Sequence, residues 1–326
     1  MIRNIIVKQV SKPIRLDKYL KEEIKDVSRE KIIHCIKQGK VKIEGKNKVK
    51  PSFILKGGEK IYVDISEFDE KKVVALKPQS LFPEPKVLYE DEDLIAIDKP
   101  AGIIVHPSSD NPWCPSIAGW LVKKFPFLLD VGDPSIGSGQ ENLRPGIVHR
   151  LDKETSGVLI AAKNNFSFNY LKNLFKERKI RKKYIALVRG EIKTQEGRIN
   201  LPLGRSKKSP TKKKVIIKNR RAEKSKAALT KYRVLKRFQG YTLLEVIPET
   251  GRTHQIRVHL SSIGFPVIGD KFYGKSKQSM DLNLSRHFLH AQEISFVSPK
   301  GKFLKIESSL PLELKEIIKK LEPKID

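Results

Sequence analysis

Cysteine is scarce in this sequence, and so are patterns that could bind a metal ion. The two cysteines, Cys35 and Cys114, lie far apart in a chain of 326 residues. A disulfide framework needs several cysteines, and a zinc site needs cysteine or histidine ligands at short spacings. Two pairs of histidines lie close together in the sequence, but neither has a carboxylate in a ligand pattern. We therefore expect no disulfide and no metal site.

Long apolar runs are also missing. No segment approaches the roughly 18 apolar residues of a membrane-spanning helix. The first ten residues, MIRNIIVKQV, lack the apolar stretch and the cleavage site of a signal peptide. We therefore expect a soluble, cytoplasmic protein that does not act at a membrane, and we expect it to be a monomer.

Acidic residues are fewer than basic residues in this sequence. The chain has 66 Lys and Arg against 37 Asp and Glu, a formal net charge of +29. An excess of this size predicts a polyphosphate partner such as nucleic acid. Hydrophobic residues make up 39% of the chain, so the charge belongs to a folded protein and not to a basic tail. The length suits about two domains.

One acidic residue lies in an informative segment, RPGIVHRLDKETSGVLIAAK at 144–163. The pattern predicts a tight turn at 155–157 and a buried strand at 158–162, with Asp152 at the edge of a rigid element. An aspartate in such a place most often hydrogen-bonds its own turn. The flanking residues favour a different interpretation.

HRLDKETSG resembles the second motif of the pseudouridine synthases, in the form found in the ribosomal large-subunit (RluA-type) family. Three further segments resemble that family's other motifs in the same order: VLYEDEDLIAIDKPAGIIVHP at 87–107, RKKYIALVRG at 181–190 and ETGRTHQIRVHLSSIGFPVIGDKFYG at 249–274. HFLHAQEISFVSP at 287–299 fits the family's C-terminal strand region. The resemblance covers the chain from Val87 onward. Because four motifs occur in register, a chance match is very improbable.

The resemblance implies roles for three residues. It makes Asp152 the catalytic aspartate, and it places Tyr184 against the uracil ring, where it stacks and can take the carbon 5 proton. A carboxylate in a closed pocket needs an opposite charge to stay ionised, ideally a planar bidentate partner. Arg257 is our candidate, and the resemblance assigns it the same role. Arg252 is instead expected to be a structural or RNA contact.

Arg150 is expected to help expose the target base. A base stacked in RNA must be flipped out before an enzyme can act on it, which leaves a gap that a side chain can fill. Arg150 precedes Asp152 by two residues, so both project to the same face of an extended segment. His149 points the other way and is interpreted as a structural, hydrogen-bonding histidine.

The N-terminal part predicts a small module. Leu16, Tyr19, Leu20 and Ile24 repeat at helical spacing, a second helix follows with Ile32, Ile33 and Ile36 on one side, and strands are expected at 40–43 and 60–65. Residues 14–65 resemble the S-four-type RNA-binding domain named after a small-subunit ribosomal protein. The candidate phosphate contacts are basic residues that a merely solvated helical face would also explain: Arg15, Lys18, Arg29, Lys37, Lys40 and Lys42.

These observations predict an α+β protein. The expected organisation is an RNA-binding domain at 1–65, a proline-punctuated linker at 66–85, and a pseudouridine synthase catalytic domain at 86–326. Hairpins are expected at 86–98 and 226–246, and helices at 116–123, 165–177, 253–262 and 312–321. Hairpins outnumber crossover units, which favours a mixed, largely antiparallel sheet flanked by helices.

A dense run of Lys and Arg fills 205–226, a connection between strands. It is expected either to grip an RNA backbone or to form a disordered basic loop.

Isomerising uridine adds and removes no group, so we expect no cofactor. Asp152 can act as a nucleophile at the anomeric carbon or as a base on the neighbouring ribose proton. The expected substrate is structured RNA, favouring large-subunit ribosomal RNA because of the added RNA-binding module. The alternatives are transfer RNA, or a ribosome-assembly factor that binds RNA without catalysis.

Overall fold

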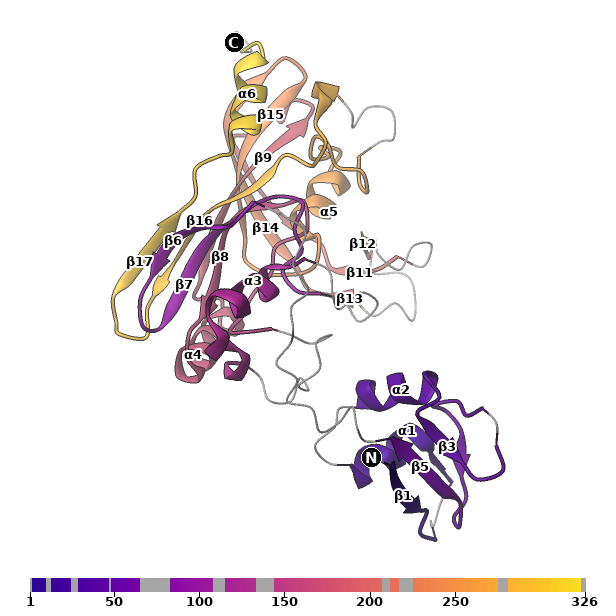
Figure 1. Cartoon of the computed structure of the whole chain (residues 1–326). Helices are drawn as coiled ribbons and strands as arrows, with labels where there is room; N and C mark the ends of the chain where they lie inside the picture. Colours follow the sequence, from indigo (N-terminus) through magenta and orange to yellow (C-terminus); the bar gives the residue numbers. More distant parts are fainter. Residues whose placement is uncertain are drawn as a thin grey trace. The chain divides into compact units, whose positions relative to one another are not determined.

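A computed structural model describes residues 2–9, 13–24, 29–46, 48–64, 83–107, 115–132, 144–206, 212–216, 225–274 and 281–323 (Figure 1). Some predicted features lie outside these ranges: Cys114, all but the last three residues of the 66–85 linker, and residues 207–211 and 217–224 of the basic run. The chain divides into two compact units. One consists mainly of residues 1–78, and the other of 79–106, 115–132 and 144–326.

The first unit combines two helices with short strands. Its helices are α1 (Leu16–Glu23) and α2 (Arg29–Lys37). Its three-stranded antiparallel sheet has the order β1 (Ile2–Ile6), β5 (Lys60–Asp64), β3 (Val41–Ile43), and β2 (Ile14–Arg15) pairs with β4 (Ile54–Leu55). The helical spacing of Leu16, Tyr19, Leu20 and Ile24 buries all four side chains in one core with the strands.

A nine-stranded sheet forms the second unit. Its order is β10 (Glu196–Asn200), β14 (Leu229–Phe238), β15 (Tyr241–Pro248), β9 (Arg181–Arg189), β16 (Leu289–Val297), β8 (Ser156–Ala162), β7 (Leu94–Lys99) and β6 (Lys86–Glu90), with β17 (Phe303–Glu307) on β16. Among the described strands of this sheet, only the β16–β8 pair is parallel. The predicted mixed, largely antiparallel α+β fold is confirmed.

Helices and a small second sheet complete this unit. The helices are α3 (Ile117–Lys124), α4 (Asn165–Lys176), α5 (Gln255–Ser262), α6 (Leu312–Lys320) and the 3-10 turns η2 (Pro126–Asp130) and η4 (Asp281–Asn283). The small sheet has the order β12 (Lys213–Val215), β11 (Leu203–Arg205), β13 (Ser225–Lys226). Side-chain oxygens cap α3 and α4, because Ser116 accepts from the Gly119 N–H and Asn164 from the Ser167 N–H.

Two predicted boundaries are wrong, each for a physical reason. The helix expected from 253 begins at Gln255, because His254 has a left-handed backbone with a φ of 58°. The turn expected to include Ser156 and Gly157 ends before them. Both residues belong to β8, where they pair with His290 and Ala291 of β16.

None of the helices in the described ranges is long and apolar enough to cross a membrane.

Candidate active site

Asp152 lies in the turn that leads into β8. The Thr155 N–H donates to the Asp152 carbonyl over 3.0 Å and closes the turn. The side chain of Asp152 is 19% exposed. Because β8 is buried along its whole length in the middle of the sheet, the turn is held at a rigid edge.

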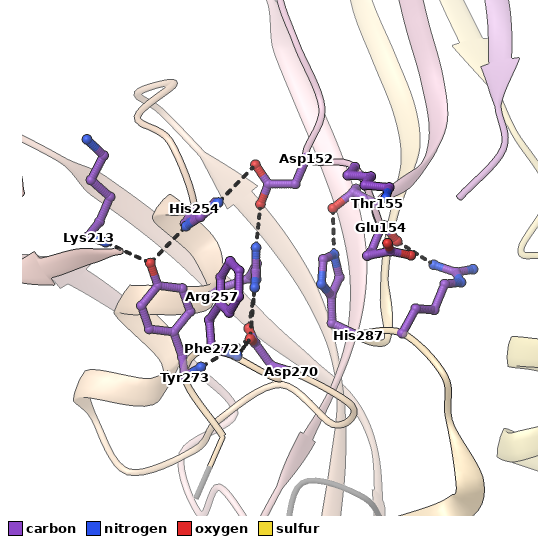
Figure 2. Close-up of polar contacts among 12 residues, drawn as sticks. Asp152, Glu154, Thr155, Lys213, His254, Arg257, Asp270, Phe272, Tyr273 and His287 are labelled. Carbon is purple, nitrogen blue, oxygen red and sulfur yellow. Dashed lines mark hydrogen bonds and ion pairs between the residues drawn. The ribbon is translucent and has the colours of Figure 1, made fainter. Parts of the chain in front are cut away.

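Arg257 meets Asp152 from the first turn of α5 (Figure 2). Its Nη1 donates to Asp152 Oδ2 over 3.0 Å, so the structure brings together the two residues that the sequence paired. The predicted bidentate geometry is wrong for this pair. The bidentate partner of Arg257 is Asp270: Nε donates to Oδ2 over 2.7 Å, and Nη2 donates to Oδ1 over 2.8 Å.

Asp270 therefore fixes the guanidinium that faces Asp152. Asp270 is fully buried, and its Oδ1 also accepts the backbone N–H groups of Phe272 and Tyr273 over 2.9 and 3.1 Å. Burial opposes ionisation, but the hydrogen bonds from Arg257 outweigh it and lower the pKa of Asp270. Burial likewise opposes the charge of Arg257, yet its carboxylate partners raise its pKa. The pair is therefore ionised.

Tyr184 lies in β9 and lines the same cavity as Asp152 and Arg257. In the sheet register it pairs with Ala291 of β16 on one side and Val246 of β15 on the other. Ala291 is in turn the partner of Gly157, so Tyr184 is near the start of β8. Burial and the charge of Asp152 raise the pKa of the Tyr184 hydroxyl, which keeps it protonated.

One cavity of about 610 Å³ contains all three predicted catalytic residues. Its cationic lining comes from seven residues: Arg144, Arg150, Lys176, Arg178, Lys182, Arg252 and Arg257. Asp152 and Glu249 are the acidic residues in the described lining. Burial lowers the pKa of Lys182 to about 8. The volume suits a nucleotide, and the charge suits its phosphates.

Arg150 lies in the same cavity as Asp152, on the exposed side. Its Nη1 is 3.5 Å from His106 Nε2. Burial, together with the charges of Arg150 and Arg144, lowers the pKa of His106 to about 4, so His106 is neutral. Among its described polar contacts Arg150 has no carboxylate.

Residues 93–262 match the family model described as RNA pseudouridylate synthase. The chain belongs to this family. A match to the S4 domain covers residues 14–61. The activity of the chain is therefore that of a pseudouridine synthase, and its S4 domain is an RNA-binding module.

Relatives of this synthase agree with that assignment. An uncharacterized RNA pseudouridine synthase of Aquifex aeolicus is 39% identical over 94% of this chain and 94% of its own. Ribosomal large subunit pseudouridine synthase D of Borreliella burgdorferi is 34% identical, over 91% of this chain and 86% of its own. The structure of human RNA Pseudouridylate Synthase Domain Containing 1 superposes with a TM-score of 0.58 at 25% identity, covering 75% of this chain and 92% of that one.

The sequence interpretation of the synthase missed the residues that hold the Asp152 turn. His287 Nε2 lies 2.8 Å from Thr155 Oγ1, and burial lowers the pKa of His287 to about 3. Lys99, which is fully buried, donates to the carbonyl of Lys153 over 3.1 Å. Lys99 and His287 lie in segments that resembled family motifs, but spacing alone did not connect them to Asp152.

Gln255 holds the loop that carries Arg252 and His254. Its buried side chain accepts from the Arg252 N–H and the Thr250 hydroxyl, over 3.0 and 2.7 Å, and donates to the Leu229 carbonyl over 3.0 Å. Arg252 Nε donates to the carbonyl of Ala227 over 3.3 Å and the residue remains exposed. The hydrogen bond to Ala227 is a structural contact, and the expected RNA contact of Arg252 stays a prediction.

His149 has a structural environment. Its Nε2 accepts the Ile160 N–H over 2.9 Å, and its ring stacks on Phe175 at 4.9 Å. Burial lowers its pKa to about 3. The side chain therefore fastens the segment before Asp152 to β8 as a neutral ring.

The predicted phosphate contacts of the S4 domain fall into two groups. Arg15 and Arg29 both bind the buried carboxylate of Asp17, through contacts of 3.0 and 2.7 Å. Their side chains remain 43% and 44% exposed, so each can also face a ligand. Lys18, Lys37 and Lys42 are exposed and Lys40 is half-buried.

Proposed function

We propose that this synthase converts uridines of large-subunit ribosomal RNA to pseudouridine, with Asp152 as its catalytic carboxylate. The observation that carries the proposal is the ionised Arg257 at 3.0 Å from Asp152 inside a cationic cavity of nucleotide size. The ribosomal substrate is supported by the relatives named ribosomal large subunit pseudouridine synthase D, and by the S4 domain.

The reaction breaks the bond from uracil N1 to ribose C1′ and forms a bond from C5 to C1′. The C5 proton leaves and N1 gains one, so atoms balance without a second reactant. Asp152 either attacks C1′ and is later displaced, or takes the C2′ proton and returns it. Both routes begin from a charged carboxylate, which Arg257 stabilises.

Tyr184 contributes the face of its ring and a protonated hydroxyl. Stacking of the uracil on this ring holds the base while it turns from N1 to C5. Its raised pKa keeps the phenol neutral, so we assign Tyr184 to positioning the base. A phenol that already carries its proton can receive the C5 proton only by releasing its own in the same step, and N1 is the atom that needs a proton.

Arg150 occupies the space left when the target base leaves its stack. A guanidinium can stack on neighbouring bases while it pairs with phosphate. Its position at the exposed side of the cavity, free of a carboxylate partner among the described residues, supports this role.

Mapping of pseudouridine tests the proposal. Unmodified large-subunit ribosomal RNA and bulk transfer RNA are incubated with wild type and Asp152→Asn, and pseudouridine is located by carbodiimide adducts that stop reverse transcription. We expect new stops in ribosomal RNA with wild type alone. Stops confined to transfer RNA would show that transfer RNA, and not ribosomal RNA, is the substrate. Binding without stops in either RNA would favour a non-catalytic assembly factor.

A further inference from the structure

The two oxygens of the Asp152 carboxylate face different partners. Oδ2 accepts from Arg257, whereas Oδ1 faces Nε2 of His254 at 4.0 Å (Figure 2). His254 lies three residues before Arg257, and its side chain is 13% exposed. This distance is too long for a hydrogen bond but short enough to become one after a small movement of the carboxylate.

The other nitrogen of the His254 ring lies beside Tyr273. Nδ1 is 2.8 Å from the Tyr273 hydroxyl oxygen, which also accepts the backbone N–H of Lys213 over 2.8 Å. Because that N–H can only donate, the hydroxyl has its own hydrogen free for Nδ1. His254 then accepts at Nδ1 and carries its proton at Nε2, directed at Asp152.

The surroundings of His254 favour the neutral ring and hold it in place. Burial lowers the pKa of the ring, and the positive charge of Arg257 acts in the same direction against the opposing charge of Asp152. The left-handed φ of 58° is one that histidine and asparagine adopt more readily than most residues. The rings of Phe272 and Tyr273 lie 5.8 and 5.7 Å from the imidazole and restrict its rotation.

We propose that His254 and Tyr273 are positioning residues that orient the Asp152 carboxylate and link it to the basic strand β12. The link runs from the Lys213 N–H through the Tyr273 hydroxyl and the His254 ring to Asp152 Oδ1. The proposal rests on the catalytic role of Asp152 proposed above. Arg257 fixes one oxygen by charge, and His254 supplies an N–H donor to the other.

The link has a consequence for RNA binding. Lys212 to Lys214 belong to the basic segment that is expected to contact the RNA backbone. The Lys212 ammonium also donates to the Phe272 carbonyl over 3.2 Å, beside Tyr273. RNA bound to β12 therefore fixes the Lys213 N–H, which holds the Tyr273 hydroxyl that sets the His254 tautomer. Correct docking of the RNA thereby favours the productive orientation of the Asp152 carboxylate.

Nitrogen-15 NMR of the His254 ring, in full-length protein, tests the tautomer directly. We expect the Nε2–H form in wild type and a loss of that preference in Tyr273→Phe. In turnover measurements Tyr273→Phe should lower kcat by roughly 10- to 100-fold, the effect of a misplaced catalytic group, with RNA affinity unchanged. Tyr232→Phe is the matched control, because the Tyr232 hydroxyl contacts Thr194 at 3.4 Å and lies outside the cavity lining.

Substitutions of His254 separate donation from backbone conformation. His254→Gln places an amide N–H near the position of Nε2, whereas His254→Asn suits the left-handed backbone but is too short to reach Asp152. We expect Gln to retain more of kcat than Asn. An Nδ1–H tautomer in wild type, or equal kcat in wild type and Tyr273→Phe, would overturn the link. Lack of turnover in wild type on any RNA would contradict the proposed function instead, because the NMR result does not depend on activity.

Discussion

Arg257 divides its guanidinium between a fully buried carboxylate and a partly exposed one. Its Nε and Nη2 donate to Asp270, and its Nη1 donates to Asp152. The described cavity lining does not include Asp270, so Asp270 acts on the reaction through the residues that it holds, above all Arg257. A residue outside the cavity thus sets the charge and direction of a residue inside it.

Asp270→Asn should therefore impair both stability and turnover. The substitution leaves a buried guanidinium without its main counter-charge, which costs about 3 kcal/mol of unfolding free energy. Arg257 is then free to rotate away from Asp152, so kcat should fall by at least tenfold. Urea denaturation and single-turnover kinetics measure the two effects, and Asp130→Asn, at an exposed position, is the control. Wild-type kcat in Asp270→Asn would remove this role.

Lys99 is a buried ammonium that donates to the carbonyls of Pro100, Ile103 and Lys153 over 2.8, 2.9 and 3.1 Å. Burial, with a contribution from Arg286, lowers its pKa from 10.5 to about 7. Between these values the unfolded chain binds more protons than the folded one, so stability rises with pH. Wild type should gain roughly 2–3 kcal/mol relative to Lys99→Met between pH 7 and 9.

The Lys99 prediction is checked by urea denaturation across that pH range. At pH 7 the Met variant also leaves three buried carbonyls without a donor, and it should loosen the turn beside Asp152. Lys86→Met, on the exposed side of the neighbouring strand, should follow wild type at every pH. A stability difference that does not change with pH would show that Lys99 titrates normally.

At the scale of elements, the parallel contact between β8 and β16 positions the Asp152 turn. A Cβ on Gly157 would lie 2.2 Å from the Ala291 carbonyl oxygen, at a φ of 113°. Only glycine allows the two strands to approach so closely. The turn that holds Asp152 directly precedes β8, so its position depends on this close approach of the two strands.

Gly157→Ala should destabilise the protein by more than about 3 kcal/mol, because a steric clash adds to the backbone strain. Gly264→Ala is the control, since its φ of 91° is also positive but nothing lies within 4 Å of the added Cβ. That variant should lose only about 1 kcal/mol. Equal losses in the two variants, measured by urea denaturation, would mean that the close approach of β8 and β16 is unimportant.

Strong local patterns were sufficient to predict many elements. The buried apolar run of β8, the hairpin of β14 and β15 and the helices α3 and α4 were all predicted from the sequence. Strands β1 and β10 to β13 were missed, because they are short or charged and depend on partners distant in sequence. Asp270 was missed for the same reason. Only the folded chain brings it to Arg257, 13 residues earlier, and the sequence suggested Asp152 as the bidentate partner.

At the scale of the whole molecule, the net charge of +29 should make RNA binding strongly dependent on salt. Part of that dependence is expected to come from β12 and its neighbour Lys212. Helix α6, which carries Lys315, Lys319 and Lys320, lies at the top of the second unit in Figure 1, away from β12. The two clusters have equal charge and so provide a matched pair.

Replacing Lys212, Lys213 and Lys214 by Gln should weaken RNA binding and reduce the slope of log Kd against log salt by about 2. The same replacement of Lys315, Lys319 and Lys320 should leave the slope unchanged. Filter binding at several salt concentrations measures both variants. Equal slopes for wild type and the β12 variant would place the RNA backbone elsewhere.

Release of tritium from carbon-5-labelled uridine tests the central claim most directly. Labelled, unmodified large-subunit ribosomal RNA is mixed with wild type or Asp152→Asn without cofactors, and RNA affinity is measured on the same samples. The account predicts rapid release with wild type, none with Asp152→Asn, and equal affinity for both. Release by Asp152→Asn at the wild-type rate would contradict the assignment of Asp152 as the catalytic carboxylate.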